Sequence, residues 1–317
     1  MAQNRIQFQQ GLSLPAFMAR YGTEAQCEAA LEQARWPDGF RCPRCGESAH
    51  CVLHSSRRKR FQCNACRHQT SLTAGTVMQG TKLPLTTWFL AIHLISQAKT
   101  GLSGLALKRH LGVSYPTAWA LQHKLMTAMA KREGRYMLDG IVQVDDAYLG
   151  GERTGGKSGR GSENKVAFVA AVSLDDAGHP RRVKLTPVAT FSSEVMGRWA
   201  RTWLAPGSTV QSDGLGCFRA VTQADCRHEP TVVGGRKPRE LPEFQWINTV
   251  LGNLKTSLSG SYHAFAFVKY AARYLAAFAY RFNRRFDLAT LPTRLLVAAV
   301  RCRPAPVRSL RLADSHC

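Results

Sequence analysis

Three polar residues have the side-chain types and the sequence surroundings of a metal site: Asp145, Asp213 and Asn248. Asp145 ends the alternating run Ile-Val-Gln-Val-Asp and Asp213 follows the run Ser-Thr-Val-Gln-Ser, so each is expected at the end of a strand. Polar side chains at the carboxyl ends of strands can meet in one crevice. Carboxylate and amide oxygens hold Mg²⁺, and two such ions about 4 Å apart catalyse phosphodiester chemistry in nucleases. These residue types therefore indicate metal-dependent chemistry on a phosphodiester.

A predicted helix combines the third of these residues with a cation. Asn248 and Lys255 are seven positions apart within the segment 246–263, which is about two helical turns, so they share one helix face. An amide that ligates a metal ion and an ammonium group that contacts a phosphate could therefore act together. Asp146 is an auxiliary candidate, and a solvated carboxylate is the alternative for it. Strand alternation directs Asp146 away from Asp145 unless the strand has already ended.

Four of the ten cysteines form two Cys-x-x-Cys pairs, Cys42 with Cys45 and Cys63 with Cys66, separated by seventeen residues. Two such pairs supply four thiolates in a tetrahedron, which is the geometry of a structural Zn²⁺ site. The segment between the pairs also contains possible competing ligands, namely His50, Cys51 and His54. A closed site of four cysteines does not need them.

The charge of the chain indicates its partner. Forty-three Lys and Arg residues against twenty-one Asp and Glu residues give a formal charge of +22. A field of that sign favours a polyanion, and double-stranded DNA is a better candidate than a membrane surface because no apolar run of 18 residues is present. The polar start of the chain does not resemble a signal peptide, so we expect no membrane partner and a reducing, cytoplasmic compartment.

The segment 81–134 contains a helix-turn-helix pattern. After a predicted helix over 84–98, a second helix ends at Gly112, which suits a left-handed C-cap, and a third begins at Ser114 with Pro116 in its first turn. The third helix would enter the major groove of DNA, and an ordinary helical hairpin is the alternative. Its candidate DNA contacts are Tyr115, Thr117, Gln122 and Lys124.

Two further basic stretches are candidates for contacts with phosphate groups. One precedes the second cysteine pair, and the other is a Gly-rich loop that follows the Asp145 strand. The alternatives are a solvated hairpin face for the first and a plain hairpin loop for the second. The candidates are Arg57, Arg58, Lys59 and Arg60 in the first stretch, and Arg153, Lys157 and Arg160 in the second.

The elements that must position the acidic residues follow an α/β order. Apolar strands predicted at 165–173 and 181–187 complete a three-stranded meander with the Asp145 strand. A helix predicted at 193–204 then leads to the short Asp213 strand. This order predicts a mixed sheet in an α/β fold.

The remaining elements are predicted around this sheet. Residues 14–35 form two short helices, with Thr23 capping the second and Cys27 packing in its core. A short strand is expected near 231–233. A last long helix is expected near 265–286, and its stripe of aromatic residues at every fourth position is interpreted as core.

Four segments in this order make the chain resemble the bacterial insertion-sequence transposases of the DDE superfamily, in the branch with an N-terminal zinc ribbon. They are residues 35–46 (Arg-Trp-Pro-Asp-Gly-Phe-Arg-Cys-Pro-Arg-Cys-Gly), 144–151 (Val-Asp-Asp-Ala-Tyr-Leu-Gly-Gly), 212–214 (Ser-Asp-Gly) and 248–263 (Asn-x6-Lys with Gly-Ser-Tyr-His). The resemblance covers about residues 16 to 290. It implies an RNase H-like catalytic domain and cleavage of transposon ends with two Mg²⁺ or Mn²⁺ ions. It also implies strand transfer into target DNA and a homo-oligomer that holds two ends together.

The resemblance also assigns roles. Asp145 matches the first catalytic acid and Asp213 the second, and Lys255 matches a basic residue expected to contact DNA near the scissile phosphate. Asn248 occupies a position that is Glu in most of the superfamily, although Asn also occurs in this branch. An amide oxygen coordinates a metal ion but carries no charge, so this site has a charge of about −2 rather than about −3, and we expect weaker binding of one ion.

Other third ligands are less favoured by the sequence. Glu243 is the nearest acid at the start of the helix, but the position seven residues later is Val250 rather than a basic residue. His263 could lie near the site, and a structural hydrogen bond is the favoured interpretation for it.

The predicted organisation follows the motifs along the chain. It comprises N-terminal helices (1–36), a zinc ribbon (37–80), a helix-turn-helix region (81–134), an RNase H-like catalytic domain (135–290) and a basic C-terminal tail (291–317). Two other functions remain open at this point. One is a DNA-binding repressor or domesticated derivative that has lost catalysis, and the other is a nuclease of Holliday-junction type.

Overall fold

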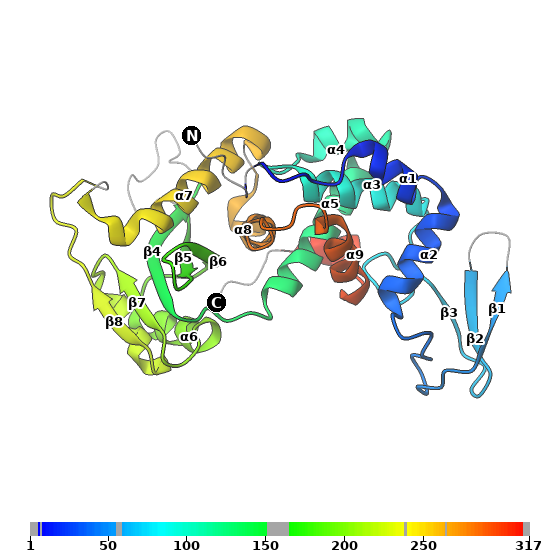
Figure 1. Cartoon of the computed structure of the whole chain (residues 1–317), viewed down its shortest axis with the longest axis horizontal. Coiled ribbons are helices and arrows are strands. Elements are labelled where there is room, and N and C mark those ends of the chain that lie inside the picture. The colour runs from blue at the N-terminus through cyan, green and yellow to red at the C-terminus, as the bar shows by residue number, and fades with distance from the viewer. Residues whose placement is uncertain are drawn as a thin grey trace. The chain divides into compact units, whose positions relative to one another are not determined.

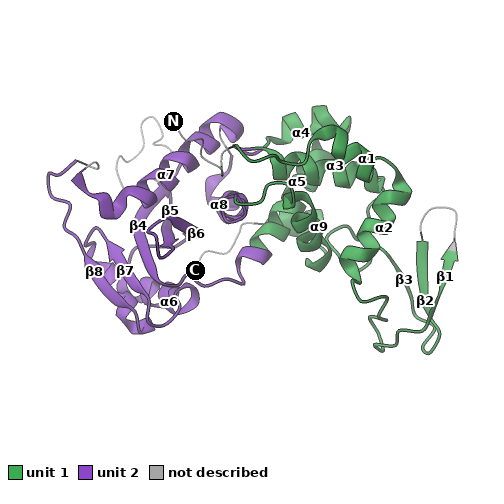
Figure 2. Ribbon diagram, viewed as in Figure 1, with its two compact units in different colours: residues 1–98, 102–131, 286–310 green, residues 99–101, 132–285, 311–317 purple. Residues whose placement is uncertain are grey.

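The computed structural model describes residues 6, 8–54, 59–150, 165–237, 240–263 and 265–312. The chain folds into two compact units, which Figure 2 shows in separate colours. Unit 1 comprises residues 1–98, 102–131 and 286–310, and unit 2 comprises residues 99–101, 132–285 and 311–317. Each unit therefore combines segments that lie far apart in the sequence.

Unit 1 begins with two short helices, α1 (Leu14–Tyr21) and α2 (Glu24–Arg35), as the sequence predicts. The hydroxyl of Thr23 accepts the amide N–H of Gln26 at 3.3 Å, and the side chain of Gln26 accepts the amide N–H of Thr23 at 3.0 Å. This reciprocal capping box satisfies amide groups at the start of α2 that have no partner within the helix. Cys27 is fully buried on α2, which confirms that it packs in the core.

A small antiparallel sheet follows, formed by β1 (His50–His54), β2 (Lys59–Cys63) and β3 (Gln69–Ser71). The rings of Phe40 and Phe61 stack beneath it with their centroids 5.2 Å apart. A core of this size buries little apolar surface, and domains this small usually need a bound metal ion for stability.

Three helices occupy the segment in which a helix-turn-helix is predicted: α3 (Leu85–Gln97), α4 (Gly104–Leu111) and α5 (Tyr115–Glu133). Gly112 ends α4 with a φ of 64°, in the left-handed region that glycine adopts without strain. The hydroxyl of Ser114 accepts an amide N–H of the first turn of α5. The predicted helix, glycine turn and second helix are thus confirmed.

The end of the chain differs from the prediction. Residues 291–301 form a helix, α9 (Leu291–Arg301), and α10 (Val307–Leu310) follows it. The apolar side chains of α9 are buried, and the helix packs against α2 and α3 within unit 1. The prediction of a basic C-terminal tail from residue 291 is therefore wrong, because Leu291, Leu295 and Ala299 recur at helical spacing and form part of a core.

Unit 2 is built on a five-stranded mixed sheet with the order β6-β5-β4-β7-β8. Antiparallel pairing joins β4 (Ile141–Leu149), β5 (Val166–Leu174) and β6 (Pro180–Pro187) into the predicted meander. Parallel pairing adds β7 (Thr209–Ser212) and β8 (Arg227–Pro230) on the other side of β4. This mixed α/β arrangement confirms the predicted fold class and is consistent with an RNase H-like domain.

Helices cover both faces of this sheet, and α6 and α7 lie on opposite sides of β4 in Figure 1. One face packs against α6 (Ser193–Trp203) and the 3₁₀ helix η2 (Gly216–Ala224). The other face packs against α7 (Gln245–Ser257) and α8 (Phe267–Phe282). Each face contributes its own apolar cluster, so β4 and β5 are buried on both sides.

The bounds of the last strand and of the long helix α8 differ from the predicted ranges. The last strand is Arg227–Pro230 rather than 231–233, because the polar residues of β8 show no apolar alternation at this edge of the sheet. Helix α8 ends at Phe282, and Phe286 is 53% exposed. The residues of α8 that face the sheet are the small or aliphatic Ala271, Leu275 and Ala279, while most of the aromatic stripe is half-buried beside them.

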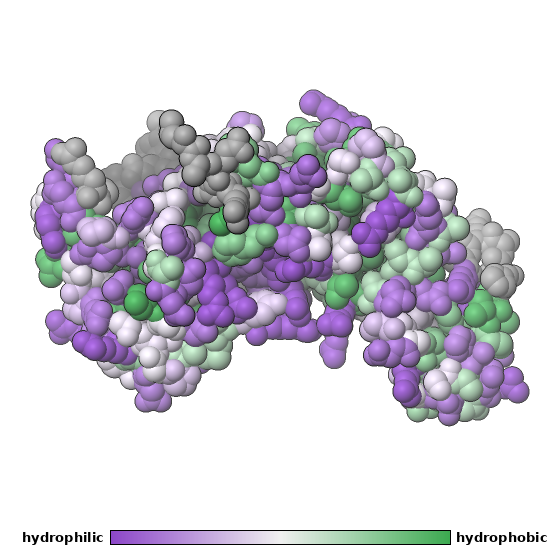
Figure 3. Space-filling model, viewed as in Figure 1, coloured by the Kyte–Doolittle hydropathy of each residue, from purple (hydrophilic) through white to green (hydrophobic). Residues whose placement is uncertain are grey.

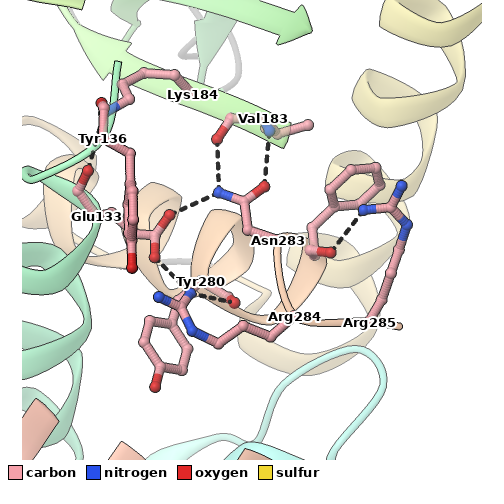
Figure 4. A network of polar contacts seen from close by, with 9 residues as sticks. Glu133, Tyr136, Val183, Lys184, Tyr280, Asn283, Arg284 and Arg285 are labelled. Atoms are coloured by element: carbon pink, nitrogen blue, oxygen red, sulfur yellow. Dashed lines mark hydrogen bonds and ion pairs between the residues drawn. The ribbon is translucent and has the colours of Figure 1, made fainter. Parts of the chain in front are cut away.

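A buried polar network closes the core of unit 2 (Figure 4). The carboxylate of Glu133 accepts hydrogen bonds from Asn283 at 2.6 Å and from Arg284 at 2.5 Å. Asn283 also pairs with both backbone groups of Val183 on β6, and the ammonium group of Lys184 donates to the carbonyl of Glu133. Removing one partner from such a buried pair typically costs about 3–5 kcal/mol, because the other charge is left uncompensated.

The hydropathy of one face of the molecule is mixed. The face drawn in Figure 3 is largely hydrophilic, with apolar residues scattered among charged and polar ones. Within the described ranges, no helix has both the length and the apolar character needed to cross a lipid bilayer.

Candidate functional site

The parallel pairing of β4 with β7 brings the first two acidic residues together. Ile141 to Val144 pair with Thr209 to Ser212 in register, so Asp145 and Asp213 follow at the same level of the two strands. Carboxylate oxygens of Asp145, Asp146 and Asp213 all lie within 4.8 Å of one another. Sheet register therefore assembles a cluster of three carboxylates from two distant segments.

The course of β4 differs from the prediction at this point. The strand does not end at Asp145 but continues to Leu149, paired with β5 alone. Asp145 follows Gln143 on the face of β4 that packs against α7, whereas Asp146 follows Val142 and Val144 on the face toward α6. The carboxylate of Asp146 nevertheless reaches the cluster, which alternation alone did not indicate.

Helix α7 adds the third predicted residue. Asp145, Asp213 and Asn248 line one cavity of about 170 Å³. Lys255, two turns further along α7, is exposed, and its positive charge favours the ionised form of Asp145. Glu243 lies in the short 3₁₀ helix η4 (Pro242–Phe244) and does not line the cavity.

The acidic cluster disfavours the ionised form of Asp145. The pKa of Asp145 is raised from 3.8 to about 7, first by burial and then by the neighbouring carboxylates of Asp146 and Asp213. A hydrogen bond from the backbone of Asp146 and the charge of Lys255 only partly offset this effect. A divalent cation would remove the repulsion, so the donor set of carboxylates and an amide fits a hard metal ion.

Asp213 is held by the turn that follows β7. Its Oδ1 accepts the amide N–H of Leu215 at 3.0 Å, which fixes one carboxylate oxygen. Gly214 has a φ of 84°, so the chain turns away immediately after the acid. Ser212 is fully buried and pairs with His228 on β8 at 2.9 Å. The acid is thus positioned by the backbone on both sides.

The sequence did not predict where two further residues, Arg236 and His263, lie relative to the site. Arg236 lines the cavity, and its guanidinium group donates to the carbonyl of Val233 at 3.2 Å and to that of Val232. The sequence signal was a Gly-Gly-Arg-Lys loop just before α7, which is typical of phosphate contacts. His263 is exposed with a φ of 51°, and its backbone N–H donates to the carbonyl of Leu258.

The four cysteines form a second cluster, in unit 1. Sulfur atoms of Cys42, Cys45, Cys63 and Cys66 all lie within 4.8 Å of one another. The two pairs have matching turns: Gly46 donates its N–H to the carbonyl of Cys42, and Arg67 donates to that of Cys63. Both donors have positive φ, 80° for the glycine and 57° for the arginine. Four converging thiol groups on two such turns fit tetrahedral Zn²⁺.

Two of the three possible competing ligands, His50 and Cys51, do not join this cluster. His50 lies against the ring of Phe40 with centroids 4.7 Å apart, and its Nδ1 lies 2.8 Å from the carbonyl of Ser48. Cys51 is exposed on β1, outside the group of four. The side chain of His54 is outside the described residues.

The predicted DNA contacts on α5 differ in availability. Tyr115 is 45% exposed, and Thr117 is half-buried with its hydroxyl 2.9 Å from that of Ser114. Gln122 is only 2% exposed, and its amide donates to the carbonyl of Leu102 at 2.7 Å, so its assignment as a DNA contact is corrected. Lys124 is partly buried with its Nζ 5.8 Å from the ring of Trp88, and burial lowers its pKa.

Of the other basic candidates, Lys59 and Arg60 lie within the described residues. Lys59 forms an ion pair with Glu32 at 2.5 Å, and Arg60 is exposed on β2. The remaining predicted phosphate contacts, Arg57, Arg58, Arg153, Lys157 and Arg160, lie outside the described residues.

Comparison with known proteins agrees with this arrangement. Residues 137–283 match the ISXO2-like transposase domain, and residues 22–69 match the transposase zinc-ribbon domain. A 129-residue stretch is 27% identical to an uncharacterised protein in the transposable element ISH50 of Halobacterium salinarum. That match covers 40% of this chain and 42% of the relative. The two matched ranges are thus similar to a transposase zinc ribbon and to a transposase domain, in the order that the sequence motifs indicate.

Proposed function

We propose that this chain is the transposase of an insertion sequence, which binds terminal inverted repeats and catalyses DNA cleavage and strand transfer. The observation that carries the proposal is the single cavity lined by Asp145, Asp213 and Asn248 within the residues that match a transposase domain. The formal charge of +22 supplies the attraction for a DNA substrate.

The three cavity residues would hold divalent metal, Mg²⁺ or Mn²⁺. Two bound ions would polarise the phosphodiester and stabilise the attacking and leaving oxygens. Asp145 is central to this role because its carboxylate neighbours both other acids of the cluster. Asn248 would contribute an oxygen without a charge, and Asp146 would act as an auxiliary carboxylate that makes the site more negative.

Cations around the cavity would hold the substrate. Lys255 and Arg236 are the candidates for contacts with phosphates beside the scissile bond, since both are exposed and one lines the cavity. Tyr115, Thr117 and Lys124 remain candidates for base or backbone contacts by the helix-turn-helix. The zinc ribbon would add structural Zn²⁺ and further contacts to the transposon ends.

The domain roles follow the two units. We propose that residues 37–80 and 81–134 recognise terminal DNA and that the sheet of unit 2 carries out the chemistry. Catalysis on two ends requires at least two active sites, so we propose a homo-oligomer in the synaptic complex.

A cleavage and strand-transfer assay on duplexes that carry the element's own ends tests the proposal. Wild-type protein should nick these duplexes only when Mg²⁺ or Mn²⁺ is present, and Asp213→Ala should not. Full activity of Asp213→Ala would refute the role of this cavity.

The neutral Asn248 favours a second candidate, a DNA-binding derivative without catalysis. Both functions predict binding to duplexes with the terminal repeats, so binding does not separate them. Metal-dependent nicking by the wild type separates them, and so would activity that first appears in Asn248→Glu. Retained binding without nicking in the wild type would support the repressor.

A further inference from the structure

Helix α7, which carries Asn248, begins without a cap of its own. The residue before its first turn, Phe244, provides no side-chain hydrogen bond to the helix. The first amide groups of any α-helix have no partner within the helix, and a buried one must find an acceptor elsewhere. The amide of Ile247 belongs to this first turn and lies in the core of unit 2.

The missing acceptor comes from β4. The amide N–H of Ile247 donates to the side-chain Oε1 of Gln143 at 3.0 Å. Gln143 is 2% exposed, so this bond forms away from water. A glutamine more than a hundred residues upstream therefore caps α7 from the neighbouring strand.

The two ends of this bond adjoin the two sides of the cavity. Gln143 precedes Asp145 by two positions on the same face of β4. Ile247 is the residue immediately before Asn248. One hydrogen bond thus links the backbone segments that present an acidic ligand and the amide ligand to the same space.

Apolar packing alone would not fix this distance. Ile247, Val250 and Leu254 hold α7 against the sheet, but apolar contacts have no direction and tolerate small shifts of a helix along its axis. A hydrogen bond between buried groups weakens steeply when it is stretched or bent. The bond from Gln143 therefore selects one axial position for the first turn of α7.

A second tether to the same turn offers an internal comparison. The indole N–H of Trp246 donates to the carbonyl of Gly178, in the exposed β5–β6 turn, at 2.7 Å. Water can replace this bond at the surface, whereas it cannot easily replace the bond to Gln143 in the core.

We propose that Gln143 is a positioning residue that sets the geometry of the metal site by holding Asn248 at a fixed distance from Asp145. The proposal rests on the proposed function, since it requires metal ions at these side chains. It predicts that loss of the Gln143 bond loosens the first turn of α7 and weakens metal binding, without removing a ligand.

Three variants of the full-length, zinc-loaded chain test this. Gln143→Met removes the acceptor at similar side-chain length, Gln143→Glu retains an acceptor, and Trp246→Phe removes only the surface tether. Hydrogen exchange of peptides covering residues 244–252 is measured without divalent metal other than zinc. Binding of Mn²⁺ is measured separately by the loss of its free electron-spin signal.

The expected results differ between the variants. In Gln143→Met the first turn of α7 should exchange faster and Mn²⁺ affinity should fall about tenfold, the low end of the effect of lost outer-shell support. Gln143→Glu should keep the slow exchange of the wild type. Trp246→Phe should change Mn²⁺ affinity less than about threefold, because an exposed hydrogen bond contributes little net free energy.

Each contrary result identifies what has failed. If the wild type does not bind Mn²⁺ at this site, so that Asp213→Ala changes nothing, the proposed function fails. If the wild type binds Mn²⁺ and Gln143→Met binds it equally well, only the positioning role is overturned. Should Gln143→Met not fold, fast exchange in a folded Gln143→Glu would overturn the role by itself.

Discussion

The two clusters of this chain place metal ligands in opposite ways. The four cysteines lie within 25 positions of sequence, from 42 to 66, and each pair is formed by a turn that its own backbone closes. The candidate ligands Asp145, Asp213 and Asn248 come from β4, the residue after β7 and the start of α7, so three distant segments must pack before they meet. The first arrangement is local and closed, and the second depends on the tertiary structure and stays open to a substrate.

Because of this difference, we expect substitutions of the ligands to affect stability differently in the two clusters. A closed site of four thiolates stabilises its small domain outright, so its ligands are required for folding. In the acidic cluster, like charges oppose folding until a cation binds, so under the proposed function its residues serve catalysis while they disfavour stability. Substitutions should therefore have opposite effects on stability in the two clusters.

The largest effect is expected from breaking the closed cluster. Cys63→Ser should abolish tight zinc binding and unfold the β1–β3 sheet, because structural zinc contributes about 10–16 kcal/mol of binding free energy in small zinc domains. Zinc content by mass spectrometry and proteolysis of residues 37–80 measure this. Cys51→Ser is the matched control, since Cys51 is exposed on the same sheet outside the cluster, and it should keep its zinc. An intact, zinc-free Cys63→Ser ribbon would contradict the structural role.

The next effect is expected in the open cluster. Asp213→Ala should reduce DNA cleavage about a thousandfold, because several kcal/mol of charge stabilisation by the metal ions is lost. The same variant should unfold at an equal or higher temperature in the absence of divalent metal, since one of three adjacent carboxylates is gone. Asp176→Ala, in the exposed β5–β6 turn, is the charge-matched control and should cleave normally. A marked loss of stability in Asp213→Ala would remove the contrast between the clusters.

The stability and metal affinity of the acidic cluster should depend on pH through Asp145. The pKa of Asp145 is about 7 in the folded chain against an ordinary value of 3.8, so the folded state binds this proton more tightly than the unfolded state. The contribution of Asp145 to the stability of the metal-free protein is therefore fully present below pH 3.8 and is lost progressively as pH rises to about 7. Protons compete with Mn²⁺, so its affinity should fall below pH 7 by up to about tenfold per unit.

Two measurements isolate that residue. Mn²⁺ titrations between pH 5.5 and 8 should show the loss of affinity. The metal-free stability of Asp145→Asn should lack the decline between pH 3.8 and about 7 that the wild type has. An unchanged pH profile in Asp145→Asn would assign the proton to another group.

The smallest effect is expected from adding a charge. Asn248→Glu should strengthen Mn²⁺ binding roughly tenfold, because ligand charge is a main determinant of affinity for hard cations. Asn253→Glu places the same charge on an exposed position of α7 outside the cavity and serves as the control. Equal gains in both variants would show a general field effect rather than ligation by residue 248.

The sequence predicted the local cluster more completely than the assembled one. The Cys-x-x-Cys spacing alone indicated all four ligands, since the turns that join them are local. Asp145, Asp213 and Asn248 were predicted to converge, whereas strand alternation directed Asp146 away from Asp145 and the Gly-Gly-Arg-Lys loop did not show that Arg236 would line the cavity. Those features depend on how the side chains and a loop are arranged in the folded protein, which residue patterns do not encode locally.

The fold was predicted unevenly for the same reason. Strands buried on both faces, such as β5, and helices with recognisable caps, such as α2, match their predicted ranges closely. The edge strand β8 was misplaced because an edge strand of polar residues has little pattern. The helix α9 was missed because a basic, Pro-containing segment follows it, at residues 301–308. The burial of Gln122 also required the structure, since its partner is a backbone carbonyl in another segment.

The placement of α9 in unit 1 has a consequence for the synthesis of this chain. Helices α2 and α3, against which α9 packs, leave the ribosome early, whereas α9 is translated only after the whole sheet of unit 2. At about 5–20 residues per second, this interval lasts on the order of 10–40 s. During that time the apolar faces that await α9 remain open to chaperones and proteases. A premature stop codon before residue 291 would therefore leave the nascent N-terminal unit without its closing helix, and such a fragment should be degraded rather than persist as a competitor of the full chain.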